Sequence, residues 1–337
     1  MQQSGAPWGT VLAGGEGRRL QSLTRDGQGR VVPKQFCSFL GTQSLLRSAI
    51  DRLATAVDRR RIIVVVAASH RQWWQRELAD IEPENIVVQP VNRGTACGVL
   101  LPLAHLAARD PEARVVVAPS DHFVEDEPGY AASLRQAVEI VDSRPGLLIV
   151  LGIRPDHPSP DYGWILGAQP GEDGVQLVST FVEKPKPELA RRLMASGALW
   201  NSFNFAASVA GLMARMRRAL PWLSECFELL ASGQHRDGRG ALLPRFYARL
   251  PHVDFARQVL EHSVGRFHVL PVPPCGWADL GTPERVTECA RRWSCLHAED
   301  CDVMTDGVAR SAAPVNLVRA VAGLQGLDAL RNYEAAD

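Results

Sequence analysis

The 337-residue chain carries 37 basic and 37 acidic side chains, so its formal net charge at pH 7 is zero. A neutral chain has no general electrostatic attraction to nucleic acid or to an anionic membrane surface, and we expect neither as a partner. No apolar run is long enough for a membrane span and residues 1–5 do not resemble a secretion signal, so we expect a cytoplasmic protein.

Strands and helices are predicted to alternate along the first half of the chain. Short apolar runs typical of strands buried on both faces occur at 8–12, 62–66, 85–88, 114–118 and 147–151. Helical patterns lie between them, at 44–54, 70–79, 95–109 and 130–141. This alternation predicts an α/β fold with a doubly wound, mostly parallel sheet. Ligands of such sheets bind at the carboxyl ends of the strands, where Gly14, Asp121 and Gly152 are expected.

The pattern changes from about residue 155. Additional strands are predicted at 163–166, 178–182 and 265–272, and helices at 187–196 and 209–230. The pattern weakens after residue 290, and a short strand and a closing helix are expected within 302–337. We therefore expect one domain over 1–290 and a C-terminal extension over 291–337, which has no room for a second catalytic domain.

Seven cysteines occur without a C-x-x-C pair, and their odd number does not suggest a disulfide framework. Cys289, Cys295 and Cys301 lie near His297, but their six-residue steps do not match the usual zinc geometry. We expect free thiols.

A glycine-rich, basic loop follows the first predicted strand. Gly14, Gly15 and Gly17 let backbone N–H groups come close to an anion, and Arg19 and Lys34 offer fixed positive charge to phosphate oxygens. The glycine spacing matches neither the Walker pattern nor the dinucleotide-binding fingerprint. From these residues alone, either a phosphate-binding loop or an ordinary glycine-rich turn is predicted.

Asp121 follows the strand predicted at 114–118 and belongs to Pro-Ser-Asp-His (119–122). A carboxylate at a strand end beside a phosphate site is a natural ligand of Mg²⁺, which prefers few carboxylates, several waters and the phosphates of its substrate. An aspartate that caps a helix or closes a turn is an equal alternative. Neighbouring residues of an extended segment point to opposite sides, so His122 is interpreted as structural.

Leu-Ala-Gly-Gly-Glu-Gly-Arg-Arg-Leu (12–20) and Pro-Lys-Gln-Phe (33–36) together resemble the signature of the sugar-1-phosphate nucleotidyltransferases, and most closely that of the mannose-1-phosphate guanylyltransferases. The resemblance continues in order to about residue 285. It implies a Rossmann-like, GT-A-like fold with additional strands and helices in the C-terminal half. The segment 24–30 is longer than the family spacing, and we expect it to form a mobile lid. The resemblance implies that these residues bind the nucleotide: Leu12, Ala13, Gly14, Gly15, Gly17, Arg18, Arg93, Gly94, Thr95 and Ser120.

The same resemblance implies that a second aspartate belongs to the site. Gly-Trp-Ala-Asp-Leu-Gly-Thr (276–282) resembles the family's Trp-Ser-Asp-Val-Gly, and Pro-Ser-Asp-His resembles its Pro-Ala-Asp-His. The resemblance implies that Asp121 and Asp279 hold a catalytic Mg²⁺ or Mn²⁺ ion. Two carboxylates and a triphosphate suffice for one octahedral ion without His or Cys.

Four segments resemble the part of the family that binds the sugar phosphate: 161–165, 181–185, 200–205 and 251–256. Glu183 can accept hydrogen bonds from sugar hydroxyls and Lys184 can pair with the phosphate, although an exposed Glu–Lys ion pair is the alternative. Asp161 and Phe203 each stand where the family has glycine. The implied sugar-phosphate-binding residues are Gly163, Glu183, Lys184, Asn201 and Asp254.

The loop 89–96 resembles the family's Glu-Pro-x-x-Arg-Asn-Thr-Ala, which reads the nucleobase and ribose. Gln89 replaces the Glu, and Gly94 replaces the Asn. We expect Gly94 to remove a side-chain contact and loosen the backbone. A plain helix N-terminus capped by Thr95 is the alternative.

The resemblance implies transfer of a nucleotidyl group from a nucleoside triphosphate, expected to be GTP, to a sugar-1-phosphate, expected to be mannose-1-phosphate. The products would be GDP-mannose and pyrophosphate, and a homo-oligomer is compatible with the sequence. The expected catalytic residues are Arg19, Lys34, Asp121 and Asp279. A thymidylyl- or uridylyltransferase is one alternative, which Pro-Lys-Gln-Phe and the Asn201 segment disfavour. A non-catalytic regulatory paralogue that binds a nucleotide sugar is the other, which retention of the four catalytic residues disfavours.

Overall fold

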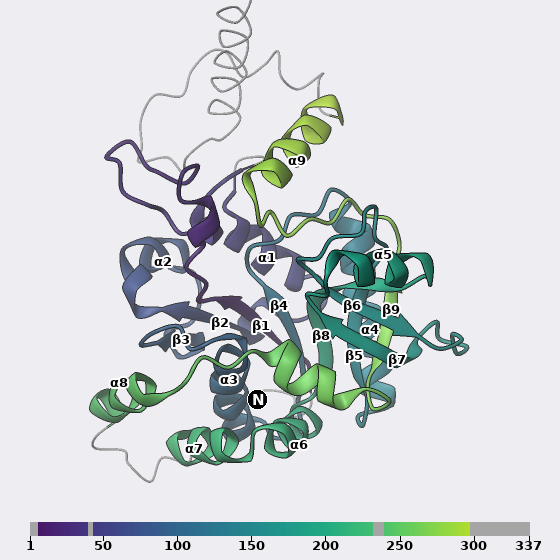
Figure 1. The fold of residues 1–337 in the computed structure, drawn as a ribbon. Helices are drawn as coiled ribbons and strands as arrows, with labels where there is room; N and C mark the ends of the chain where they lie inside the picture. Colours follow the sequence, from purple (N-terminus) through teal and green to yellow (C-terminus); the bar gives the residue numbers. More distant parts are fainter. Residues whose placement is uncertain (1–5, 40–42, 232–238, 297–337) are drawn as a thin grey trace, which may run out of the picture.

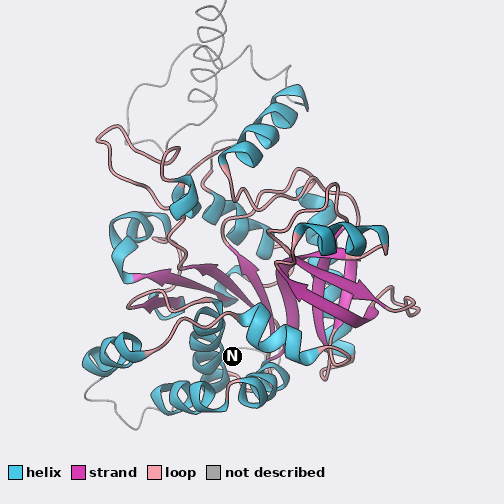
Figure 2. Ribbon diagram, viewed as in Figure 1, coloured by secondary structure: helices cyan, strands magenta, loops and turns pink. Residues whose placement is uncertain are grey.

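The computed structural model describes residues 6–39, 43–231 and 239–296. Within these ranges, nine strands form one sheet in the order β3-β2-β1-β4-β8-β5-β9-β7-β6, with helices on both faces (Figures 1 and 2). The strand and helix expected within 302–337 lie outside the described residues. The predicted boundary at residue 290 falls inside the last described helix, α9 (Pro283–Leu296).

The first four strands form the parallel part of the sheet. They are β1 (Trp8–Ala13), β2 (Ile62–Ala67), β3 (Ile86–Gln89) and β4 (Arg114–Pro119). Neighbouring residues of β2 belong to different hydrophobic clusters: Ile62 and Val64 pack on one face of the sheet and Ile63 on the other. Burial of both faces explains why these strands appear in the sequence as continuous apolar runs.

The second half of the sheet is mixed, so the expected mostly parallel sheet holds only for β1 to β4. The strands here are β5 (Leu148–Ile153), β6 (Gly163–Gly167), β7 (Gln176–Glu183), β8 (Leu199–Ser208) and β9 (His268–Val272). β5 and β9 pair in parallel, whereas β8 runs antiparallel to β4 and β5, and β7 runs antiparallel to β6 and β9.

β8 lies at the centre of the sheet but was not among the predicted strands. Its sequence carries polar residues that the fold buries, which hides the apolar pattern of a central strand. Buried Ser202 donates a hydrogen bond to the Leu151 carbonyl at 2.7 Å, and the Asn204 side chain donates to the Ser202 carbonyl at 2.9 Å. Internal hydrogen bonding makes these polar groups tolerable in the core.

Helices cover the two faces of the sheet (Figure 1). α1 (Leu45–Leu53) and α4 (Glu127–Ser143) pack into one hydrophobic cluster, whereas α3 (Thr95–Arg109), α6 (Val209–Ala219) and α7 (Pro221–Ala231) pack into the other. The remaining helices are α2 (Arg71–Glu77), α5 (Pro187–Ala195), α8 (Arg239–Arg249) and α9. None of the helices in the described ranges is both long and apolar enough to cross a lipid bilayer.

The predicted helix over 209–230 is interrupted. Leu220 leaves the helical conformation (φ −138°, ψ 62°) and Pro221 starts α7. Proline has no N–H to donate and disfavours a helical conformation in the residue before it, so two helices form where one was expected.

The segment 24–30 is a turn closed on itself. The Asp26 carboxylate accepts hydrogen bonds from the backbone N–H groups of Gln28 and Arg30 and from Arg30 Nε, at 2.9, 2.9 and 2.7 Å. The Arg30 guanidinium lies 5.3 Å from the Trp73 ring centroid on α2. No residue of 24–30 lines the cavity described below, so the contacts expected of a lid are not present in this structure.

Cys37, Cys97, Cys226, Cys275 and Cys289 are free thiols, as expected. The group of Cys289, Cys295, Cys301 and His297 lies largely outside the described residues.

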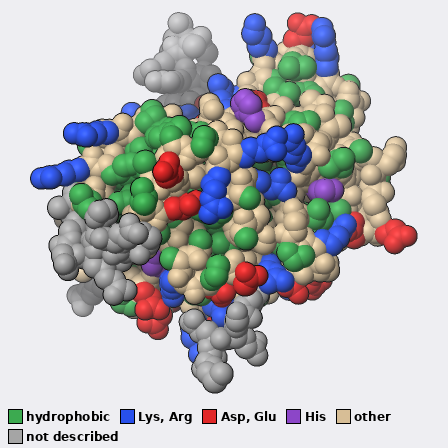
Figure 3. Space-filling model, turned by 90° about the horizontal axis from the view of Figure 1, so that it is seen from below, with side chains coloured by type: hydrophobic (Ala, Val, Ile, Leu, Met, Phe, Trp, Pro, Cys, Tyr) green, Lys and Arg blue, Asp and Glu red, His purple; other side chains and the backbone are tan. Residues whose placement is uncertain are grey.

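On the face drawn in Figure 3, acidic and basic side chains lie interspersed with hydrophobic ones.

Candidate active site

A cavity of about 380 Å³ opens over the carboxyl ends of β1, β3 and β4. A second hollow adjoins it and shares Arg19, Asn92, Asp121 and His252 with it. The predicted residues that line the first cavity are Leu12, Gly14, Gly15, Arg19, Gly94, Thr95, Ser120, Asp121, Gly163, Glu183, Lys184, Asn201, Asp254 and Asp279. Gly17, Arg18 and Lys34 line the second. Ala13 is buried in β1, and Arg93 lines neither.

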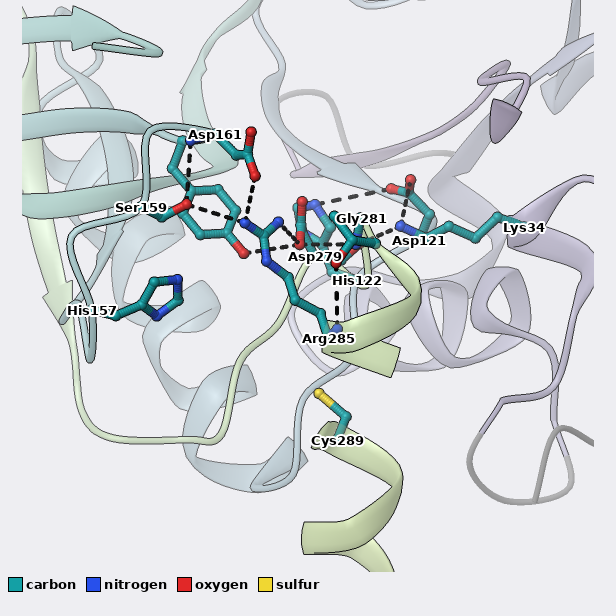
Figure 4. A network of polar contacts seen from close by, with 12 residues as sticks. Lys34, Asp121, His122, His157, Ser159, Asp161, Asp279, Gly281, Arg285 and Cys289 are labelled. Atoms are coloured by element: carbon teal, nitrogen blue, oxygen red, sulfur yellow. Dashed lines mark hydrogen bonds and ion pairs between the residues drawn. The ribbon is translucent and has the colours of Figure 1, made fainter. Parts of the chain in front are cut away.

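The fold brings Asp121 and Asp279 to one wall of this cavity. Phe123 and Ala278 exchange two backbone hydrogen bonds of 2.9 Å, so the segment after β4 runs antiparallel to the segment before α9. Buried Lys34 connects the two: Nζ lies 3.2 Å from Asp121 Oδ2 and donates a hydrogen bond to the Asp279 carbonyl (Figure 4). One ammonium group therefore contacts both predicted metal-binding residues.

Both carboxylates are kept ionised although both are partly withdrawn from water. Desolvation opposes ionisation of Asp121, but the favourable contacts around it, foremost the charge of Lys34, together outweigh desolvation and lower the pKa of this carboxyl. Burial likewise opposes ionisation of Asp279, and the charges of Arg285 and Lys34 outweigh it, so this pKa is also lowered. Two ionised carboxylates in one cavity are a donor set suited to a hard divalent cation.

These residues fit a metal ion that completes its coordination elsewhere. Within the described ranges no group of three or more His, Cys, Asp or Glu side chains is arranged to hold a metal. Asp121 and Asp279 thus offer two oxygen-donor side chains, and the other ligands would have to be phosphate oxygens and water, as is usual for Mg²⁺.

His122 packs against the core as interpreted from the sequence, but it also lines the cavity beside Asp121, which the alternation of an extended segment did not predict. Its ring lies edge-to-face on Trp277 with centroids 5.0 Å apart. Burial lowers the pKa of His122 to about 4, so the ring is neutral at pH 7.

Two amides hold the glycine-rich loop in place. Gln35 Nε2 donates to the carbonyls of Ala13 and Gly15 at 2.8 and 3.0 Å, and Asn92 Nδ2 donates to the Gly14 carbonyl at 3.4 Å. The sequence interpretation missed both roles, although Gln35 lies inside the Pro-Lys-Gln-Phe motif. These contacts form an ordered loop at the end of β1.

The two loop arginines differ in their environment. Arg18 pairs with Glu16 at 2.5 Å, and its side chain is mostly exposed. Arg19 is exposed, lines both hollows and has no hydrogen-bond or ion-pair partner among the described residues. Arg19 is therefore the loop cation available to a bound phosphate.

The loop 89–96 departs from expectation at three residues. Arg93 donates to the carbonyls of Tyr247 and Ala248 at the end of α8, at 2.8 and 3.1 Å, and so points away from the cavity. Gly94 is not loosened: it has φ 90°, and a Cβ atom there would lie 2.2 Å from the Val253 carbonyl oxygen. Thr95 does not cap α3, because its hydroxyl instead accepts a hydrogen bond from the Phe255 N–H at 2.7 Å.

The residues predicted for the sugar phosphate gather at the other end of the cavity. A Cβ atom at Gly163 would lie 2.5 Å from Glu183 Oε2, so any other residue would displace this carboxylate from its present position. Glu183 is buried, which raises its pKa, and its Oε1 lies 3.3 Å from Lys184 Nζ. Asn201 Oδ1 accepts from the Phe203 N–H at 2.9 Å. Asp254 Oδ1 accepts from the Arg257 N–H at 3.0 Å while also lining the cavity.

Backbone strain is concentrated at this site. Among the described residues the non-glycine positions with positive φ are Lys184 (52°), Phe203 (57°) and Leu280 (45°). Lys184 and Phe203 line the cavity, and Leu280 follows Asp279 directly. Residues other than glycine adopt this conformation at a cost of about 1 to 3 kcal/mol. Proteins tend to retain such strained residues at functional sites.

A polar cluster around Asp279 was also missed. Asp279 Oδ1 accepts from the Tyr162 hydroxyl at 2.9 Å, the Gly281 N–H at 3.0 Å and Arg285 Nη1 at 2.9 Å. Tyr162 lies within a segment singled out from the sequence. Arg285 was not singled out from the sequence, since two of its partners, Ser159 and Asp161, come from a distant loop.

A glycine-rich basic loop, two ionised carboxylates and a carboxylate–lysine pair thus lie around two adjoining hollows of an α/β protein, and these are the residue types that binding of a phosphate group requires. A family model described as "Nucleotidyl transferase" matches residues 8–293, and the chain belongs to this family.

Curated relatives of the chain include nucleotidyltransferases. Mannose-1-phosphate guanylyltransferase from Escherichia coli K12 is 29% identical over 282 residues, covering 81% of this chain and 57% of the relative. Mannose-1-phosphate guanylyltransferase RfbM from Salmonella typhimurium is 28% identical over 279 residues, covering 81% and 56%. The chain thus spans a little over half the length of these curated relatives.

Solved structures share the fold. A protein described as mannose-1-phosphate geranyltransferase from Thermus thermophilus superimposes with a TM-score of 0.72 at 30% identity, covering 84% of this chain and 79% of that one. UDP-glucose pyrophosphorylase complexed with UDP-glucose has a TM-score of 0.55 at 15% identity, which shows similarity of fold alone.

Proposed function

We propose that the chain transfers the nucleotidyl group of GTP to mannose-1-phosphate, giving GDP-mannose and pyrophosphate. The observation that carries this proposal is the contact of Lys34 with ionised Asp121 and with Asp279, in a hollow that it shares with Arg19 and that adjoins the cavity lined by Glu183 and Lys184. Mannose-1-phosphate guanylyltransferases among the relatives support the choice of GTP and mannose-1-phosphate.

In the proposed reaction an oxygen of the sugar phosphate attacks the α-phosphorus of the triphosphate. The bond between that phosphorus and the oxygen leading to the β-phosphate breaks, and pyrophosphate leaves with the electron pair. The nucleophile is already an anion, so no general base is required. The protein then contributes position and charge neutralisation.

Each charged group has a task in this scheme. Arg19 would bind the leaving pyrophosphate, and Lys34 would neutralise charge at the transferred phosphate. Lys184 would pair with the sugar's phosphate and Glu183 would accept hydrogen bonds from its hydroxyls. Asp121 and Asp279 would hold Mg²⁺ or Mn²⁺, which when bound neutralises phosphate charge.

Pyrophosphate release over a matrix of nucleoside triphosphates and sugar-1-phosphates tests the proposal. We expect the highest rate for GTP with mannose-1-phosphate. Asp121→Asn or Asp279→Asn should lower kcat by about 10²- to 10³-fold, the scale seen when one charge-stabilising group is lost, while the fold is retained. Asp58→Asn is the control, because Asp58 is an exposed aspartate that pairs with Arg60. Absence of pyrophosphate release for every pair would favour the non-catalytic alternative.

A further inference from the structure

Arg285 connects the Asp279 carboxylate to a loop from a different part of the chain. Its Nη1 donates to Asp279 Oδ1 at 2.9 Å, and its Nη2 donates to Asp161 Oδ2 at 2.8 Å and to Ser159 Oγ at 3.1 Å (Figure 4). The guanidinium also lies 4.6 Å from the Tyr162 ring centroid. A planar guanidinium with partners on two edges and an aromatic ring against its face is held in one orientation.

The two oxygens of Asp279 are used differently. Oδ1 accepts all three hydrogen bonds that reach this carboxylate, from Tyr162, Gly281 and Arg285. Within the described ranges no donor ends on Oδ2. Three donors on one oxygen fix the orientation of the carboxylate and leave the other oxygen available to an external cation.

Charge balance gives Asp161 a role of its own. Arg285 lies beside Asp279, and its positive charge weakens the attraction of the Asp279 carboxylate for a cation. The Asp161 carboxylate compensates the guanidinium, so the Arg285–Asp161 pair is neutral and the charge of Asp279 remains.

We propose that Arg285 is a positioning residue that presents Asp279 Oδ2 to a divalent cation, and that Asp161 holds and neutralises Arg285 for this purpose. This inference rests on the proposed function, because it assumes that Asp279 binds the metal. Arg285 does not itself touch the metal or the substrates. The alternative is a structural tie between α9 and the loop before β6.

Mn²⁺ binding to the full chain, followed by electron paramagnetic resonance in the presence of a non-hydrolysable GTP analogue, tests the proposal without turnover. Arg285→Gln should weaken Mn²⁺ binding by about 10-fold, the lower end of what loss of an outer-shell partner of a metal ligand causes. Asp161→Asn should weaken it less. The double variant should bind Mn²⁺ no more weakly than Arg285→Gln, because Asp161 acts through Arg285.

Two further variants separate the possible outcomes. Arg192→Gln removes an exposed guanidinium paired with Glu188 on α5 and should leave Mn²⁺ affinity unchanged. Asp279→Ala should weaken Mn²⁺ binding, and if it does not, the metal assignment of the proposed function fails. If Asp279→Ala weakens Mn²⁺ binding while Arg285→Gln lowers only the unfolding midpoint, the tie is structural and the positioning inference is overturned.

Discussion

Lys34 Nζ lies 3.2 Å from Asp121 Oδ2, and both residues line the hollow that holds the Arg19 loop. Lys34 is buried, whereas the Asp121 side chain is 41% exposed, so water screens the pair from the carboxylate side only. The contact supplies positive charge that keeps the partly buried Asp121 carboxylate ionised, and the pH dependence of the proposed reaction should reveal it.

Lys34→Gln should move the acidic limb of the pH–rate profile to higher pH. Without the ammonium, burial dominates and raises the pKa of Asp121, so a higher pH is needed to ionise the carboxyl; His122 and Asp279 also face it. The measurement is kcat/KM for GTP between about pH 5 and 9, the range in which a raised carboxyl pKa becomes visible. Lys186→Gln, an exposed lysine after the Glu-Lys-Pro segment, serves as control and should leave the limb in place. An unmoved limb in Lys34→Gln would contradict the prediction.

Gly94→Ala should destabilise the protein and raise KM for the triphosphate. The added Cβ would lie 2.2 Å from the Val253 carbonyl oxygen, and φ at this residue is 90°, so the free energy of unfolding should fall by about 1 to 3 kcal/mol. Urea unfolding and KM measurements check both parts. Gly146→Ala is the matched control, since no atom lies within 4 Å of the place its added methyl group would take and its φ is not positive. Equal stability of the two variants would contradict the prediction, because it would mean that the loop around Gly94 relaxes to accept the methyl group.

Lys184→Gly should be more stable than Lys184→Ala, although both should lose activity. The residue has φ 52°, which glycine adopts without strain and alanine adopts at a cost of about 1 kcal/mol. Urea midpoints of the two variants measure the difference. At Arg191, an exposed position inside α5, the order should reverse, because glycine weakens a helix by about 1 kcal/mol relative to alanine. The same order at both positions would refute the strain argument.

GTP should be the best nucleotide, with weaker discrimination than in relatives that carry the complete base-reading motif. A site built to pair with guanine leaves buried groups unmatched when another base enters, which can discriminate by several kcal/mol. Here Gly94 lacks the side chain of the family's Asn, and the Arg93 side chain is hydrogen-bonded to backbone carbonyls of α8. The ratios of kcat/KM for GTP, ATP, UTP and dTTP with one sugar-1-phosphate are the measurement. A clear preference for UTP or dTTP would favour the alternative transferase.

The sequence alone determined the elements whose signal is local. The strands β1, β2 and β4 and the helix over 95–109 lie where they were predicted, because burial on both faces selects continuous apolar runs and an amphipathic helix has its own period. Local motifs likewise singled out the glycine-rich loop and Asp121, which line one cavity in the structure.

Only the tertiary structure decided which partners those residues meet. β8 carries buried polar residues, and its Ser202 and Asn204 side chains donate hydrogen bonds to the carbonyls of Leu151 and Ser202. Arg93 turns to α8, and Arg285 reaches Asp161 and Asp279 from α9. A hydrogen bond depends on distance and direction in space, and the local sequence around a residue does not encode which distant segment will supply its partner.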